Sequence, residues 1–122
     1  MKNNVPAPGT TPSSPDSIAK SRVFLVDDHP ITRQGLTALI NRETNLVVCG
    51  EADSAPVAID QIQKLAPDIA LVDVTLKTTS GIELMKNLKA LMPDMPVLMM
   101  SMHDESLFAE RALRAGAKGY IM

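Results

Sequence analysis

Two adjacent carboxylates, Asp27 and Asp28, end an apolar segment in the stretch FLVDDHPITRQG and are followed at once by His29 and Pro30. Aspartates at such a junction often only cap the next helix, where the helix dipole favours negative charge. They can also bind a cation together, because carboxylate oxygens are the ligands that hard divalent ions prefer. Taken alone, the pair leaves both interpretations open.

A third carboxylate, Asp73, and a hydroxyl, Ser101, lie near the ends of two later apolar segments, IALVDV and PVLMMS. The carboxyl ends of parallel strands meet at one edge of a sheet, and ligands bind there in open α/β folds. Three carboxylates within a few ångströms stay ionised only if a cation compensates them. Mg²⁺ fits such ligands and bridges to phosphate oxygens, and a carboxylate can itself attack phosphorus. Asp73 is the best-placed nucleophile, and Ser101 can hydrogen-bond a phosphoryl oxygen.

Strand-like and helix-like segments alternate from Ser21 onward. Five short apolar segments predict buried strands, at residues 22–26, 46–51, 69–74, 96–101 and 119–122. Their continuous apolar character is typical of parallel strands that are covered on both faces. Four amphipathic segments predict helices. The first extends from Pro30 to about Asn41, and the second begins after an N-cap at Ser54 and ends before Pro67. The third begins after an N-cap at Ser80, and the fourth extends from about Asp104 to Ala115, before Gly116. With right-handed crossovers this order predicts a doubly wound parallel α/β sheet.

The apolar positions of these helices predict which sides face the sheet. The residues expected to face inward in the first helix are Ile31, Leu36, Leu39 and Ile40, and those in the fourth are Leu107, Phe108, Ala112 and Leu113. This expectation follows from the 3.6-residue period of an amphipathic helix.

Length and composition restrict the class of protein. The chain of 122 residues fits one folded domain, and its net charge of -2 without a long basic run disfavours direct binding of nucleic acid. Residues 1–20 are rich in Pro, Ser and Thr and predict a disordered tail. A single cysteine, Cys49, excludes an internal disulfide and fits a reducing compartment. No apolar segment is long enough to span a membrane or to act as a signal peptide, which predicts a cytoplasmic protein with no membrane partner.

The stretches VDDHPITRQGL, DIALVDVTLKTTSGIEL and RALRAGAKGYIM, in this order, resemble the receiver domain of bacterial two-component response regulators. They are similar to the NarL/FixJ subgroup, whose members usually carry a LuxR-type helix-turn-helix domain after the receiver. The resemblance covers residues 21–122 and implies a flavodoxin-like (CheY-like) five-stranded sheet of order 2-1-3-4-5. It implies a signalling domain rather than an enzyme. Its partner would be a sensor histidine kinase, and DNA-binding transcription control would need an output domain that this chain lacks.

The same resemblance assigns roles to individual residues. Asp73 would be the phosphoacceptor, Ser101 the switch hydroxyl and Tyr120 the switch aromatic side chain. The implied Mg²⁺ ligands are Asp28 directly, Asp27 mainly through water, Asp73, and the backbone carbonyl of Thr75. Phosphorylation would then bias an equilibrium between two states of the domain.

The sequence departs from the family at two places. Lys77 stands where the family usually has Pro, and the sequence ends at Met122, before the position of the family's active-site Lys. Lys118 precedes Tyr120 and is expected to be solvated. We therefore expect a domain truncated before its last helix, whose uncovered sheet face makes it self-associate as a homodimer or larger assembly, or makes it poorly stable.

Three other functions are compatible with parts of the sequence. A pseudo-receiver that acts only through protein contacts remains open, and a Mg²⁺-dependent phosphohydrolase is disfavoured because Thr75 stands where the haloacid dehalogenase pattern has a second Asp. A nucleotide-binding module is disfavoured because no glycine-rich phosphate loop follows the first strand. His29 and His103 lack the close His/Cys spacing of a transition-metal site, so we expect them to be solvated or outside the direct ligand set.

Overall fold

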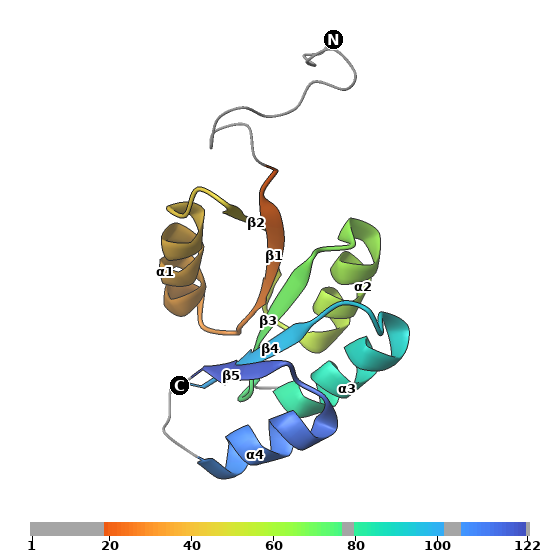
Figure 1. The fold of residues 1–122 in the computed structure, drawn as a ribbon. Helices are drawn as coiled ribbons and strands as arrows, with labels where there is room; N and C mark the ends of the chain where they lie inside the picture. The colour runs from red at the N-terminus through yellow and green to blue at the C-terminus, as the bar shows by residue number, and fades with distance from the viewer. Residues whose placement is uncertain (1–18, 77–79, 102–105, 122) are drawn as a thin grey trace.

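Strands and helices alternate along the chain in the computed structural model, which describes residues 19–76, 80–101 and 106–121, without the side chains of residues 106–110 and Tyr120. The elements are β1 (Ser21–Val26), α1 (Pro30–Asn41), β2 (Leu46–Ala52), α2 (Ala55–Leu65), β3 (Ile69–Asp73), α3 (Gly81–Leu91), β4 (Val97–Met100), α4 (Ser106–Ala115) and β5 (Gly119–Ile121). The strands form one sheet of order β2-β1-β3-β4-β5, in which all neighbours are parallel (Figure 1). The predicted fold class and strand order are confirmed.

The two faces of the sheet are covered unequally. The larger core lies between the sheet and the helices α2, α3 and α4, where Ile62, Leu88 and Ala112 are buried against the strands. On the other face, α1 is the one helix among the described elements, and Leu36 and Ile40 pack against a smaller cluster. The buried members of that cluster are Val23, Leu25, Leu71 and Met100.

The predicted helix ends are largely confirmed. Helix α1 begins at Pro30, whose fixed φ suits a first turn. Ser80 caps α3, and its hydroxyl oxygen accepts a hydrogen bond from the Ile82 amide at 3.1 Å. Ser54 occupies the N-cap position of α2 without a side-chain cap bond. Gly116 follows α4 with a φ of 114°, a conformation that favours glycine.

The predicted apolar stripes are wrong at three positions. Ile31 and Leu39 in α1 are 84% and 57% exposed, and Leu113 in α4 is 50% exposed. Helix α1 has no neighbouring helix on its side of the sheet within the described part of the chain, so only the side that carries Leu36 and Ile40 is covered. Helical periodicity predicts a wider apolar face than a single contact surface can bury.

Several predictions fall where the structure gives no description. The tail lies outside the described residues except for Ala19 and Lys20, and Lys77 and His103 also lie outside them. Leu107, Phe108 and Tyr120 lie on described elements, but their side chains are outside the description. No helix of the described ranges has the length and apolar character needed to cross a membrane.

Candidate functional site

The edge of the sheet where the parallel strands end brings the predicted acidic residues together. Val26, the last residue of β1, is paired with Val72 of β3, so Asp27 and Asp73 follow at neighbouring positions. Asp28 and His29 continue the chain toward α1. One ligand atom from each of these four side chains lies within 4.8 Å of all the others.

The imidazole of His29 lies among the carboxylates. Its Nδ1 atom is 3.0 Å from Asp27 Oδ1, 3.0 Å from Asp28 Oδ1 and 3.7 Å from Asp73 Oδ2. The hydrogen bond to Asp27 and the negative charge of Asp28 raise the pKa of His29 above its ordinary value. His29 was expected to be solvated or outside the ligand set. Its side chain is 53% exposed, yet it contacts the carboxylates directly and supplies positive charge there when protonated.

Asp73 is buried, and its two carboxylate oxygens have different surroundings. Oδ1 accepts hydrogen bonds from the Thr75 amide at 2.9 Å and from the Thr75 hydroxyl at 3.0 Å. Oδ2 is buried and forms no hydrogen bond with any described residue. Burial raises the pKa of Asp73, with the charges of Asp27 and Asp28 adding to the rise and the two Thr75 hydrogen bonds opposing it. A buried acceptor without a partner costs about 1–3 kcal/mol, so Oδ2 is the oxygen most in need of a ligand.

Arg33 fixes the loop that carries the acidic pair. Its Nη1 donates to the backbone carbonyl of Asp27 at 2.7 Å, and its Nε donates to Glu51 Oε1 at 2.8 Å. The Asp27 amide also donates to the carbonyl of Ala52 at 3.1 Å. Arg33 was not predicted as a site residue, although an arginine in the first turns of the helix after the acidic pair was the available signal.

Gly81 allows the start of α3 to approach the backbone of the third carboxylate. The Gly81 amide donates to the Val74 carbonyl at 3.1 Å. A Cβ atom at Gly81 would overlap the carbonyl oxygen of Asp73 and lie 2.8 Å from the Cα of Val74. Only glycine fits this contact without moving the segment that carries Asp73.

The remaining predicted residues lie on or next to β4 and β5. Ser101 is buried and directly follows Met100, the residue paired with Asp73 in the sheet. The Ser101 amide donates to the carbonyl of Ile121 at 2.9 Å, which ties the end of β4 to β5. Tyr120 lies on β5, paired with Met99. Lys118 is exposed in the turn before β5, as expected.

The donor set fits a hard divalent cation. Ligand oxygens of Mg²⁺ lie about 2.1 Å from the ion, so two of them are roughly 3–4 Å apart, which the close grouping of Asp27, Asp28 and Asp73 can satisfy with small movements. Oδ2 of Asp73 accepts no hydrogen bond from a described residue, so it is available as a further ligand atom for the cation. Three carboxylates favour Mg²⁺ over softer metals, which prefer several nitrogen or sulfur ligands.

Comparison with known proteins identifies the family of this chain. Residues 23–122 match the family described as the response regulator receiver domain. The chain is 39% identical over 101 residues to the DNA-binding transcriptional activator DevR/DosR of Mycobacterium tuberculosis, a match that covers 83% of this chain and 46% of that protein. It spans about half the length of the curated relatives it matches.

Two solved structures have the same fold. A LuxR-family two-component response regulator from Aurantimonas sp. SI85-9A1 is 38% identical with a TM-score of 0.79, covering 84% of this chain and 73% of that one. The receiver domain of the putative response regulator NarL from Mycobacterium tuberculosis is 32% identical with a TM-score of 0.79, covering 85% and 84% of the two chains. The chain belongs to the family of response regulator receiver domains.

Proposed function

We propose that this chain is the phosphoaccepting receiver domain of a transcriptional response regulator, with Asp73 as the phosphoacceptor. The observation that carries the proposal is the buried Oδ2 of Asp73, which has no hydrogen-bond partner among the described residues and lies beside Asp27 and Asp28. An oxygen in this position is available to react, while Oδ1 is occupied by its two hydrogen bonds from Thr75.

Asp27, Asp28, Asp73 and the backbone carbonyl of Thr75 are the residues that would hold Mg²⁺. When bound, the ion supplies positive charge that offsets the charge of the carboxylates and of a transferring phosphoryl group. Burial and, after it, the negative charges of Asp27 and Asp28 raise the pKa of Asp73, so a nearby cation would favour its ionised form.

In the proposed reaction, Oδ2 of ionised Asp73 attacks the phosphorus of a donor. A new oxygen–phosphorus bond forms, the bond from phosphorus to the donor breaks, and its electron pair leaves with the donor. The donor is a phosphohistidine of a sensor histidine kinase or a small acyl phosphate. Thr75 holds the carboxylate in orientation through Oδ1. Ser101 would hydrogen-bond a phosphoryl oxygen, and Tyr120 would respond as the switch aromatic residue.

The proposal extends to the organisation of the whole protein. In this proposal, residues 21–122 form the receiver. Control of transcription then requires a DNA-binding output domain in the complete regulator, and the phosphorelay takes place in the cytoplasm. The relatives that carry names of transcriptional regulators support this extension.

The test is the intact mass of the chain after incubation with acetyl phosphate and Mg²⁺. We expect one phosphoryl adduct on the wild type and on the matched control Asp94→Asn, which changes an exposed carboxylate. We expect none on Asp73→Asn or without Mg²⁺. An adduct that persists on Asp73→Asn refutes the assignment. No adduct on any chain, including one extended past Met122, favours a pseudo-receiver that acts only through protein contacts.

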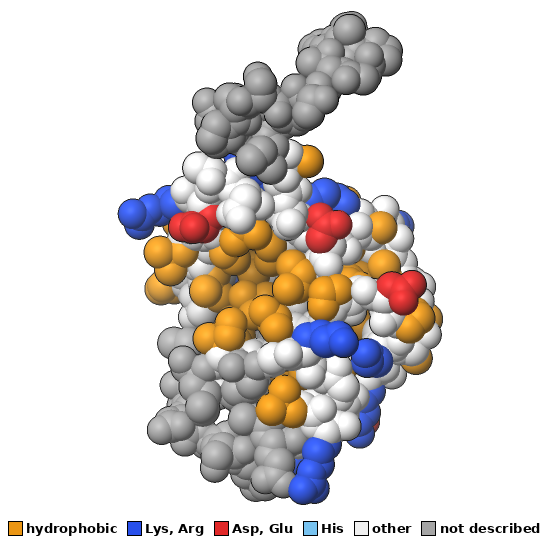
Figure 2. All heavy atoms as spheres, in the orientation of Figure 1, with side chains coloured by type: hydrophobic (Ala, Val, Ile, Leu, Met, Phe, Trp, Pro, Cys, Tyr) orange, Lys and Arg blue, Asp and Glu red, His pale blue; other side chains and the backbone are white. Residues whose placement is uncertain are grey.

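We also propose that this chain self-associates through the sheet face beside α1. A hollow of about 240 Å³ lies on that face, and the described residues that line it are all apolar: Val23, Ile40, Leu46, Ile69, Leu71, Leu98 and Ile121. Figure 2 shows apolar side chains gathered over the strands in one patch. A second copy offers a surface of the same chemistry, and two such faces can close as a symmetric dimer. Light scattering measures the oligomeric state of the chain, and a monomer at high protein concentration contradicts the proposed self-association.

A further inference from the structure

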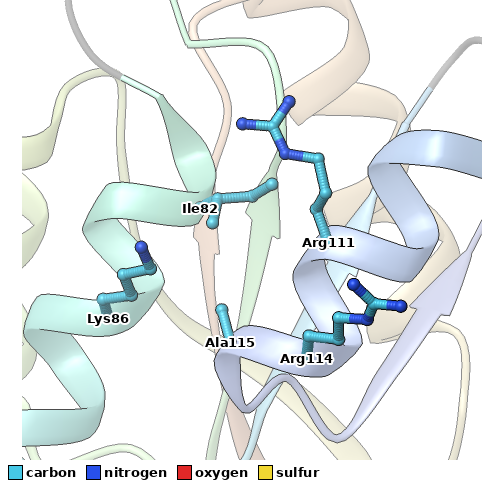
Figure 3. Close-up of a pocket in the computed structure, with 5 residues that line it drawn as sticks. All are labelled: Ile82, Lys86, Arg111, Arg114 and Ala115. Atoms are coloured by element: carbon cyan, nitrogen blue, oxygen red, sulfur yellow. The ribbon is translucent and has the colours of Figure 1, made fainter.

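A groove separates α3 and α4 on the side of the sheet away from α1. It has a volume of about 360 Å³ and is lined by Ile82, Lys86, Arg111, Arg114 and Ala115 (Figure 3). We call it the α3–α4 groove. It is distinct from the acidic cluster, since none of the four grouped side chains of that cluster lines it.

The two helices that form the groove concentrate positive charge. Together they carry the four basic residues Lys86, Lys89, Arg111 and Arg114 and the two acidic residues Glu83 and Glu110, a formal charge of +2. The whole chain, in contrast, has a net charge of -2. Opposite charge on a partner would therefore be attracted to this side of the molecule in particular.

The cations come from both walls of the groove. Lys86 stands on α3, and Arg111 and Arg114 stand three residues apart on α4; the guanidinium of Arg111 points toward the gap between the helices, and that of Arg114 lies over α4 on the side away from Lys86 (Figure 3). The pair that Lys86 makes with Glu83 is 3.6 Å long, and both side chains are more than half exposed. Such a pair contributes little, so a carboxylate of a partner can replace Glu83. Lys89 adds charge at the same seam, because its stem lies over Gly116 at the end of α4.

The floor of the groove is apolar. Ile82 is 7% exposed and lies between the two helices, beside the partly buried Ala115. An apolar floor between cationic walls is complementary to an apolar side chain flanked by carboxylates. The guanidinium groups of Arg111 and Arg114 suit this role because they bind carboxylates through two parallel hydrogen bonds.

Other anionic ligands fit less well. Among the described residues that line the groove, none has an aromatic side chain on which a nucleobase could stack. A long polyanion such as DNA gains from many clustered cations, whereas this chain is acidic overall. An acidic amphipathic segment of a protein needs only the few contacts that the groove provides.

We propose that the α3–α4 groove is a docking site for an acidic segment of a partner protein. An apolar side chain of that segment lies on Ile82 and Ala115, and its carboxylates pair with Lys86, Arg111 and Arg114. Helix α3 starts at Gly81, against the backbone of Asp73, so the docked partner contacts the element next to the phosphoacceptor. The inference does not depend on phosphorylation and stands apart from the proposed function.

The test uses the full chain and a fluorescent helical peptide that carries leucine flanked by glutamates. The groove variant is Lys86→Gln with Arg111→Gln and Arg114→Gln. The matched control makes the same change in charge at exposed cations elsewhere, with Lys20→Gln, Arg42→Gln and Lys64→Gln. Circular dichroism verifies that both variants fold. Fluorescence anisotropy then measures the affinity of each chain for the peptide and for its glutamine counterpart.

We expect the acidic peptide to bind the wild type and the control alike, and the groove variant to bind about tenfold more weakly, because it loses three exposed charge pairs. The glutamine peptide should bind none of the chains. If both variants bound the peptide equally weakly, the affinity would depend only on the net charge of the chain, and the inference would be wrong. It would also be wrong if the wild type did not bind the peptide. Displacement of the peptide by inorganic pyrophosphate at a low concentration would overturn it in favour of a phosphate ligand.

Discussion

Replacing Asp73 with Asn removes one of three carboxylates that are held close together at the end of the sheet. The substitution keeps the shape of the side chain and leaves an oxygen that can still accept the two hydrogen bonds from Thr75. What it removes is the charge of a buried group whose pKa is raised, first by burial and also by the charges of Asp27 and Asp28. We therefore expect the metal-free Asp73→Asn variant to be more stable than the wild type.

The size of the effect follows from the geometry of the cluster. Two unit charges separated by 4.8 Å, the largest spacing among the ligand atoms, repel by about 1 kcal/mol in water and by about 3.5 kcal/mol at an effective dielectric constant of ~20. Asp73 is only 2% exposed, so the higher value is the closer limit. Protonated His29, 3.7 Å from Asp73, opposes this repulsion. The expected gain in the free energy of unfolding is about 1–3 kcal/mol above the raised pKa of His29.

The sign of the pH dependence follows from the direction of the shift. Folded wild type holds a proton on Asp73 at a higher pH than the unfolded chain does, because the pKa of Asp73 is raised from 3.8 in the folded state. The cost of the charge is thus present above the raised pKa and falls away as the pH drops through it toward 3.8. The advantage of Asp73→Asn should shrink over the same window.

Urea unfolding followed by circular dichroism measures the difference in the free energy of unfolding between Asp73→Asn and the wild type, with Asp94→Asn as the matched control. Mg²⁺ should make the wild type the more stable of the two chains. A ligand at 100 times its Kd adds about 2.7 kcal/mol to the free energy of unfolding of a protein that binds it, and the variant binds Mg²⁺ less well. An Asp73→Asn variant that is less stable than the wild type without metal refutes the reasoning. So does a gain no larger than that of Asp94→Asn.

Three further predictions concern other parts of the site and fold. Gly81→Ala should cost at least about 2 kcal/mol of stability and weaken Mg²⁺ binding, since the new Cβ meets backbone atoms; thermal unfolding and Mg²⁺ titration measure this. His29→Gln should bind Mg²⁺ more tightly than the wild type only below the raised pKa of His29, where the imidazolium competes; calorimetry at two pH values decides. Leu98→Lys should make the chain monomeric in light scattering, whereas Lys64→Gln should not.

The sequence was sufficient to predict the elements and the convergence of the three carboxylates. Continuous apolar segments indicated the strands, and Pro30, Ser80 and Gly116 indicated helix ends because each acts within one or two residues of its own position. The alternation of elements predicted a parallel sheet. The order of the strands came from the family resemblance, since periodicity does not say which strands are neighbours.

The contacts that complete the site depend on tertiary structure that no local pattern encodes. The position of His29 among the carboxylates depends on the path of the loop after β1, which Arg33 fixes through the carbonyl of Asp27. The need for Gly81 arises because α3 approaches the backbone of Asp73. The exposure of Ile31 also depends on tertiary structure, because helical periodicity does not say how many other elements pack against a helix.

The metal-free site is held in an arrangement that costs stability. Hydrogen bonds from Arg33 and Thr75 and the close approach of Gly81 fix Asp27 and Asp73 beside each other, although burial and like charge raise the pKa of Asp73. His29 relieves part of this cost when it is protonated, because its Nδ1 lies within reach of all three carboxylates. Its half-exposed side chain can leave toward solvent. A divalent cation would then replace a single, mobile positive charge with a stronger one, and the fixed backbone makes that exchange possible without rebuilding the sheet edge.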